Sequence, residues 1–280
     1  MAEIKDVVVF LDGRRQGSPI IELAAQLAHE HGAHLTGAFV WPPLANEGSE
    51  AFVRGKAIKE LIASYEEEIS GYEKKLRRSF EQAANRTGLQ SEWRSVRHQL
   101  AAGMVAHARY ADLAIVGRSN TGGRDAIPLD LPQTLVLASG RPVLLIPPDP
   151  SPTSRRRILV GWNASREATR AVADALPFLT RAEAVELLVV DHERDPAAYG
   201  DEAGPDIARH LARHGVRVDV RRMASGGGDV GHLILSRAEA FGADLLVMGA
   251  YGHARLTELV FGGVTRTALH EARVPVLMSR

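Results

Sequence analysis

The chain contains an internal repeat, which limits the possible folds more than any other feature of the sequence. Three apolar segments of the N-terminal half return in the same order in the C-terminal half. Residues 5–12, 111–117 and 141–145 correspond in this way to residues 157–163, 243–249 and 274–278. A repeat of about 140 residues has the size of a domain, so the 280 residues are expected to form two copies of one fold.

Short apolar runs alternate with helical patterns within each copy. In the N-terminal half we expect strands at 4–11, 35–40, 91–97, 111–116 and 141–146, and helices at 19–31, 50–85, 101–110 and around 134–138. Such alternation predicts an α/β fold in which helices cover both faces of a parallel sheet. We therefore expect two tandem, open, five-stranded parallel α/β domains.

The boundary between the copies is marked by a proline-rich segment that begins at Pro147 and reads PPDPSP. The expected division is a first domain at 1–147, a linker at 148–156 and a second domain at 157–280. The number of residues that separates a strand from its equivalent in the second copy falls from about 151 at the first strand to about 132 at the fourth. The first copy therefore holds about 19 extra residues between these two strands. The long helix expected at 50–85 accounts for them, and Gly71 inside it would allow one break.

Composition excludes several classes of protein. The chain has no cysteine, so disulfides and thiolate metal sites are absent, and its formal net charge of zero gives no general attraction to nucleic acid or to anionic membranes. No run approaches the roughly 20 apolar residues that cross a bilayer, and the first residues lack the basic region of a signal peptide. We expect a cytoplasmic protein with neither a nucleic-acid nor a membrane partner.

The segment from Gly249 to Thr265 carries the strongest chemical signal. It follows the apolar strand 243–248 and places glycines at 249, 252, 262 and 263 before a helical pattern that starts near Val264. Glycines let backbone N–H groups approach a ligand, and the start of a helix adds unpaired donors and the positive end of the helix dipole. This combination suits an anion, above all a phosphate.

The equivalent N-terminal loop, 117–132, has lost this pattern. Asn120 stands where Gly252 would stand, and Leu131-Pro132 replaces Gly262-Gly263. Proline has no N–H to donate, and leucine blocks close approach. We infer that only the C-terminal half has kept a phosphate cradle.

The turn after the first strand of each half holds a polar residue, Asp12 in one copy and Asn163 in the other. Both stand at the carboxyl edge of a sheet, where ligands of open α/β folds gather. Either side chain can cap the following helix or contact a ligand, and both roles stay open, including whether Asp12 still meets a ligand.

Other motifs carry less. Residues 225–230, SGGGDV, are similar to the SGGxDS loop of ATP pyrophosphatases but differ at the last position, and the alternative is a loop ahead of a helix at 230–241. Histidines 210 and 214, and the cluster at 29, 31 and 34, have no carboxylate at a metal-binding spacing, so no metal site is assigned. No residue is assigned a catalytic role either, since paired carboxylates and a Ser-His-Asp set are missing.

The C-terminal half resembles a universal stress protein domain of the ATP-binding type. The family motif G-x2-G-x9-G-(S/T) is matched at its glycines by Gly249, Gly252 and Gly262, and the N-terminal half resembles a degenerate copy. The resemblance implies two adenine nucleotide alpha hydrolase-like domains packed as a pseudo-dimer, with the two fifth strands, 142–146 and 275–279, paired. It also implies a nucleotide site formed by Gly161, Trp162, Asn163, Val190, Asp191, Met248, Gly249, Gly252, His253, Gly262, Gly263, Val264 and Thr265.

Two positions depart from the family pattern. Gly263 stands where the motif has a hydroxyl, with Thr265 as a candidate substitute, and Asn163 stands where the family has an aspartate. Both changes keep the backbone cradle and remove side-chain contacts, which favours weaker binding or a shift toward AMP or ADP. The ligand expected from the resemblance is ATP or another adenine nucleotide, with or without Mg²⁺.

Three functions follow from these observations. The first is a stress-response regulator that binds adenine nucleotide with little or no catalysis, assembled as a homodimer, whose downstream protein partner is unknown. The second is a slow nucleotide hydrolase or phosphate transferase. The third is a dimerisation platform, or a sensor of another small ligand, that needs no nucleotide.

Overall fold

The computed structural model describes residues 3–11, 17–41, 56–96, 100–118, 130–148, 156–194, 204–251 and 263–280. The contacts within the chain group residues 4–139 into one compact unit and residues 140–280, together with Glu3, into another. Each unit is described by itself. None of the described helices combines the length and the apolar composition that a membrane span requires.

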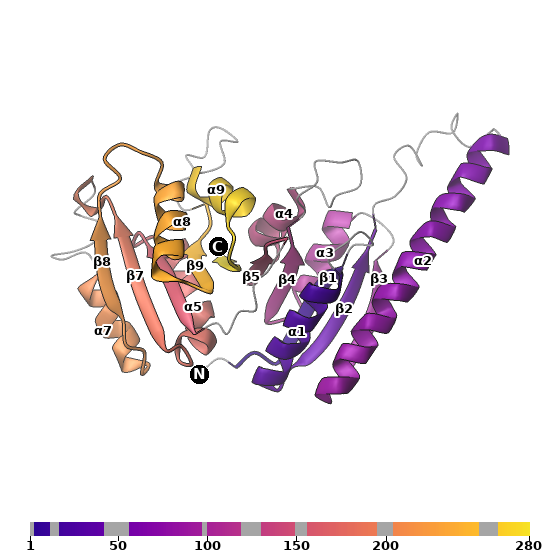
Figure 1. The fold of residues 1–280 in the computed structure, drawn as a ribbon, viewed down its shortest axis with the longest axis horizontal. Coiled ribbons are helices and arrows are strands. Elements are labelled where there is room, and N and C mark those ends of the chain that lie inside the picture. The colour runs from indigo at the N-terminus through magenta and orange to yellow at the C-terminus, as the bar shows by residue number, and fades with distance from the viewer. Residues whose placement is uncertain are drawn as a thin grey trace. The chain divides into compact units, whose positions relative to one another are not determined.

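The unit of residues 4–139 is built around four parallel strands. Its elements are β1 (Asp6–Leu11), α1 (Gly17–His31), β2 (His34–Val40), α2 (Lys56–Thr87), β3 (Ser91–Val96), α3 (Leu100–Ala108), β4 (Leu113–Gly117) and α4 (Asp130–Ala138). The strands lie in the order β3-β2-β1-β4 (Figure 1). Their apolar side chains, among them Phe10, Phe39 and Ile115, are almost fully buried and form the core.

The described part of the unit of residues 140–280 contains six strands. Its elements are β5 (Val143–Ile146), β6 (Arg157–Trp162), α5 (Arg166–Leu179), β7 (Ala184–Val190), the short 3-10 helix η2 (His192–Arg194), α7 (Pro205–Arg213), β8 (Asp219–Met223), α8 (Val230–Phe241), β9 (Leu245–Gly249), α9 (Gly263–Glu271) and β10 (Val276–Ser279). The strand order is β5-β10-β9-β6-β7-β8, and all neighbours except β5 and β10 run parallel.

The fifth strands of the two sequence copies pair with each other, as the family resemblance implied. β5 runs antiparallel to β10, with Leu145 opposite Val276 and Val143 opposite Met278. This pairing places β5 in the contact unit of the second copy, although it closes the first copy in sequence. The prediction of paired fifth strands is therefore confirmed.

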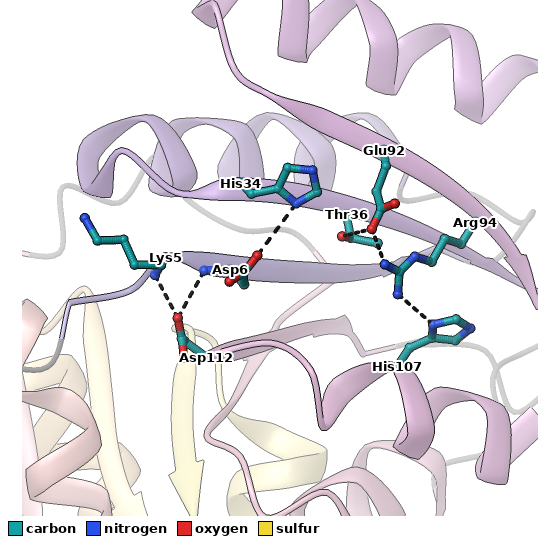
Figure 2. A network of polar contacts seen from close by, with 8 residues as sticks. All are labelled: Lys5, Asp6, His34, Thr36, Glu92, Arg94, His107 and Asp112. Atoms are coloured by element: carbon teal, nitrogen blue, oxygen red, sulfur yellow. Dashed lines mark hydrogen bonds and ion pairs between the residues drawn. The ribbon is translucent and has the colours of Figure 1, made fainter.

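One aspartate in each unit ties the first strand to the fourth, and we call this contact the aspartate clamp. Asp112 accepts hydrogen bonds from the backbone N–H groups of Lys5 and Asp6 at 2.8 and 3.1 Å, as Figure 2 shows. Asp244 accepts the same pair of bonds from Arg156 and Arg157, both at 3.0 Å. The recurrence of the clamp at equivalent positions supports the internal repeat in three dimensions.

α2 is a single helix of 32 residues, so the break that the sequence allowed at Gly71 does not occur. The inward face of the helix, with Ile69, Phe80 and Ala83 buried, packs on α1, β2 and β3. This packing keeps the backbone helical through Gly71 despite the poor helix propensity of glycine.

Candidate functional site

The order of the strands marks one edge of the second sheet as a place for a ligand. The chain leaves β6 toward β7 on one side and returns to β9 on the other, so the direction of the crossovers reverses between β6 and β9. Right-handed crossovers then put α5 and α7 on one face and α8 and α9 on the other (Figure 1). Ligands of open α/β sheets bind at the carboxyl ends of the strands at such a reversal, where Gly161 lies beside Met248.

Three residues with left-handed backbone surround this edge. Ala164, Asp191 and Tyr251 have φ angles of 57°, 52° and 65°, and among the described residues no other non-glycine residue has a positive φ. Each follows the carboxyl end of a strand, respectively β6, β7 and β9. Such a backbone costs roughly 1–3 kcal/mol at each position, and residues of this kind cluster at functional sites.

The turn after β6 is organised by Asn163, but Asn163 does not cap α5. The cap is Ser165, whose hydroxyl accepts from the N–H of Ala168 at 3.1 Å. Asn163 Oδ1 instead accepts from both the N–H and the hydroxyl of Ser165, at 3.2 and 2.7 Å. Two roles were considered for Asn163, and the prediction that it caps α5 is wrong, because Ser165 is better placed to do so. The Asn163 amide instead shapes the turn, and it is half-buried at the carboxyl end of β6.

Asp191 holds the loop that follows β8 against the end of β7. Its carboxylate accepts from the N–H of Ser225 at 2.7 Å and from the hydroxyl of Ser225 at 2.6 Å. The next two residues, Gly226 and Gly227, have φ angles of 61° and 87°, and a side chain on either would meet no atom within 4 Å. The loop therefore presents bare backbone at the same edge as the three left-handed residues.

The two glycines at the end of the central strands differ in what they do. A Cβ on Gly249 would stand 2.4 Å from the backbone nitrogen of Ala168, so this glycine is required for close packing of β9 against the start of α5. A Cβ on Gly161 would meet its nearest atom, Met248 Cβ, at an ordinary 3.7 Å. Packing alone thus explains Gly249, and it does not explain Gly161.

The start of α9 lies close to the end of β9. Thr265 is buried, and its Oγ1 accepts from the N–H of Tyr251 at 3.2 Å. This hydroxyl holds the start of α9 to the end of β9. The sequence suggested Thr265 as a substitute for the missing motif hydroxyl, and the structure shows this hydroxyl already engaged with the backbone of Tyr251. Val264 is half-buried and Gly263 is exposed.

A surface cleft of about 370 Å³ opens beside α9. It is lined by Asp229, Gly263, Arg266, Thr267, His270 and Glu271. Asp229 caps α8 by accepting from the N–H of His232 at 2.8 Å, and the His232 ring lies 3.0 Å from Glu271 Oε2. The cleft thus combines the N-terminus of α9 with one guanidinium and two carboxylates.

The structure brings most of the residues expected from the resemblance to one edge of the second sheet. Val190 ends β7 and pairs with Met223, and Trp162 ends β6 and pairs with Val189. Gly252, His253 and Gly262 lie outside the described residues. Sequence reasoning missed Arg266, although its place three residues after Gly263, one helical turn on, would have indicated that it shares a face with the helix start.

The fold is thus that of an α/β protein with two units. In the C-terminal unit, the carboxyl ends of β6, β7 and β9 form the kind of sheet edge at which α/β proteins bind ligands. The family follows from comparison: residues 154–280 match the model of the Universal stress protein family. The C-terminal region of the chain is therefore a universal stress protein domain, as the resemblance of its sequence indicated.

Curated relatives agree with this assignment, and solved structures share the fold. Universal stress proteins of Mycobacterium tuberculosis and Mycobacterium bovis are each 30% identical over 198 residues, which covers 63% of this chain and 64% of the relative's length. A universal stress protein structure from Archaeoglobus fulgidus superposes with a TM-score of 0.70 at 15% identity, covering 98% of this chain and 96% of that one. A functionally unknown protein from Pseudomonas aeruginosa gives 0.62 at 14% identity, with coverages of 99% and 92%. The predicted fold class, two tandem α/β units of this type, is confirmed over the whole chain.

Proposed function

We propose that the C-terminal unit binds an adenine nucleotide at the carboxyl edge of β6, β7 and β9, and that the protein is a stress-response regulator with little or no catalysis. The observation that carries the proposal is the set of left-handed residues Ala164, Asp191 and Tyr251, one after each of these strands. A fold that maintains three unfavourable turns at one sheet edge, where crossover direction also reverses, is organised there for a ligand.

The start of α9 is the proposed phosphate end of the site. Unpaired N–H groups at a helix N-terminus and the helix dipole favour an anion, and Gly263 leaves the backbone accessible. Arg266, one turn along the same helix, supplies a positive charge at the cleft. The glycines of the family motif, Gly249, Gly252 and Gly262, belong to the segment that leads into this helix start.

The adenosine end is proposed to lie across β6 and β7. Gly161 has room beside Met248, and Asn163 and Asp191 sit in half-buried turns at the ends of these two strands. The Asp191 carboxylate already holds Ser225, so its contribution is to fix the loop that would face the ribose. Asn163 offers a neutral amide, which cannot supply the charge of the family's aspartate.

The hydroxyls at this edge support binding rather than catalysis. Ser165 donates to Asn163 Oδ1 and Ser225 donates to Asp191, so neither hydroxyl donates to a histidine base that would activate it as a nucleophile. Mg²⁺ would enter with the nucleotide and be held mainly by the phosphates, as magnesium commonly is. Asp229, whose Oδ2 would lie 3.9 Å from a Cβ on Gly263, is the carboxylate placed to meet it.

The experiment begins with the purified protein. Heat or acid extraction followed by ion-exchange chromatography is expected to release adenine nucleotide, and calorimetry on stripped protein is expected to show binding of ATP, ADP or AMP at one site. Arg266→Gln is expected to weaken binding of ATP by about tenfold, the size of one partly exposed charge-assisted hydrogen bond. Arg273→Gln, which removes the same charge at an exposed position after α9, is the control and is expected to bind like wild type. A nucleotide-free preparation that gives no heat with any of the three nucleotides would overturn the proposal.

A further inference from the structure

The outward face of α2 carries a continuous polar stripe. Residues spaced alternately four and three apart lie along one side of a helix. The stripe consists of Glu60, Ser64, Glu67, Gly71, Lys74 and Arg78, which are exposed except for the half-exposed Gly71. It lies opposite the buried face that holds Ile69 and Phe80, and Figure 1 shows α2 continuing well past the ends of β2 and β3.

Charge along this side of α2 is separated by sign. Glu67 and Glu68 precede Gly71, and Lys74, Lys75 and Arg78 follow it. No basic residue stands three or four positions from either glutamate, and no acidic residue stands three or four positions from either lysine. Lys74 and Arg78 are instead like charges at a spacing of four, which destabilises a helix.

The usual reasons for such an arrangement do not apply here. The helix dipole favours acidic residues in the first turn and basic residues in the last turn, whereas Glu67 and Lys75 lie near the middle of a helix that spans 56–87. Pairing within the helix is used elsewhere on α2, where Arg77 and Glu81 form an ion pair at 2.8 Å. At the centre, Glu68 accepts a hydrogen bond from the neutral Tyr72 hydroxyl at 3.2 Å, which offers no opposite charge. The separation of charge there therefore favours a charged partner that lies outside this helix.

Gly71 stands at the centre of the charge pattern. Its φ is helical, and a Cβ there would meet nothing within 4 Å, so neither the backbone nor the packing of this unit requires glycine. Glycine inside a helix lowers stability relative to alanine. A glycine on an exposed helix face is useful where a second helix approaches closely.

We propose that α2 pairs with α2 of a second copy of this chain, antiparallel and crossing at Gly71. A twofold axis at this residue sets Glu67 opposite Lys75 and Glu68 opposite Lys74, and symmetry repeats both contacts on the other side of the axis. In each pair one residue, Glu67 or Lys74, belongs to the stripe and the other lies beside it. The small residues Gly71 and Ser64 allow the helices to approach. The stripe and the charges beside it are complementary only to an antiparallel copy of themselves, since a parallel pair would set like charges against each other.

The test measures the mass of the full-length chain by light scattering or sedimentation at low ionic strength over a range of concentrations. Wild type is expected to shift with concentration from 30.3 kDa toward twice that mass. Raising the salt from about 0.1 M to about 1 M should shift it back, because the screening length falls from about 10 to about 3 Å. Glu67→Lys and Lys75→Glu are each expected to weaken dimerisation at least about tenfold, since each turns two attractive contacts into repulsive ones.

Two further variants separate pairing from folding. Glu67→Lys combined with Lys75→Glu restores complementarity and is expected to dimerise like wild type. Gly71→Leu is expected to give a monomer whose melting temperature is no lower than that of wild type, because a Cβ at this position meets no atom within 4 Å and leucine favours the helix.

The matched control is Glu66→Lys, the same charge change one position away and off the stripe. It is expected to dimerise like wild type. A wild-type chain that stays at 30.3 kDa across the range would overturn the proposal, as would a dimer equally affected by Glu66→Lys and Glu67→Lys.

Discussion

A buried carboxylate joins β7 and β8 of the C-terminal unit to α8, and its removal gives a direct test of the packing described above. Glu186 on β7 is 3% exposed. It accepts from Arg237 Nε and Nη2 at 2.6 and 2.5 Å and from Arg221 Nε at 3.1 Å. The Arg237 guanidinium also lies over the ring of Phe241, 5.7 Å from its centre.

The size of the effect follows from the exposure of the two arginines. Breaking a buried ion pair from one side costs about 3–5 kcal/mol, because the remaining charge stays buried without a partner. Arg237 is 19% exposed and approaches this case, whereas Arg221 is 50% exposed and contributes at most about 1 kcal/mol. In Glu186→Gln the amide oxygen still accepts one bond, so the expected loss is about 2–4 kcal/mol of unfolding free energy.

The same carboxylate makes the loss depend on pH. Burial raises the pKa of Glu186, but the hydrogen bonds and charges of Arg237 and Arg221 outweigh it, so the pKa lies below its usual value. A carboxyl group with a lowered pKa stabilises the fold above its unfolded pKa, and this contribution disappears as the pH falls through the folded pKa. The difference between wild type and Glu186→Gln is therefore expected to be full at pH 7 and to shrink below about pH 4.5.

Urea unfolding followed by circular dichroism at pH 7 and pH 4 measures both quantities. Because the chain has two compact units, the transition of the C-terminal unit is followed separately through the fluorescence of Trp162, with the two other tryptophans replaced by phenylalanine. Glu239→Gln, an exposed position on α8, is the control and should stay within about 0.5 kcal/mol of wild type. A Glu186→Gln variant as stable as this control at pH 7 would refute the reasoning.

Two further predictions test other parts of the structure. Gly249→Ala is expected to lower the unfolding free energy by more than about 2 kcal/mol, because the new Cβ would stand 2.4 Å from the backbone nitrogen of Ala168. Gly161→Ala, where the new Cβ has room, should change the unfolding free energy by less than about 1 kcal/mol. Equal melting temperatures for the two variants would contradict this prediction. Burial and the Arg94 guanidinium lower the pKa of His107 from 6.5, and the opposing effect of Glu92 is smaller. Protonation of this histidine therefore favours the unfolded state, so the free energy of unfolding decreases as the pH falls below 6.5. His107→Gln should reduce that loss in urea titrations at pH 7.5 and pH 5.5, and an unchanged pH dependence would contradict the assignment.

The repeat and the alternation of strands and helices could be predicted from the sequence, because they depend on the order of apolar runs and turns, which a sequence shows directly. The pairing of the fifth strands was expected only from the resemblance to a known family, because no pattern of residues shows which strand edges will meet. The sequence could not show that Gly249 faces α5 at close range, because residue type does not reveal which neighbour a strand end will meet. The sequence suggested Asn163 as the cap of α5, whereas the structure shows Ser165 in that role. Asparagine and serine are equally good caps by residue type, so only the backbone geometry selects one.

The polar clusters beneath α3 and α8 show how far two copies of one fold can diverge without losing their geometry. Arg94 on β3 and Arg221 on β8 occupy the same place in the two sequence copies, because each pairs with the fifth residue of the neighbouring strand, β2 or β7. In the first unit the acid is Glu92 on β3, which binds Arg94 and also accepts from Thr36, the third residue of β2 (Figure 2). In the second unit the acid is Glu186, which is itself the third residue of β7. The carboxylate has thus moved to the neighbouring strand at the same register, while the arginine and the aspartate clamp have stayed. Because side chains exchange places in this way while strand positions are kept, a ligand site in one unit implies nothing about the other, and nucleotide binding has to be tested in each unit separately.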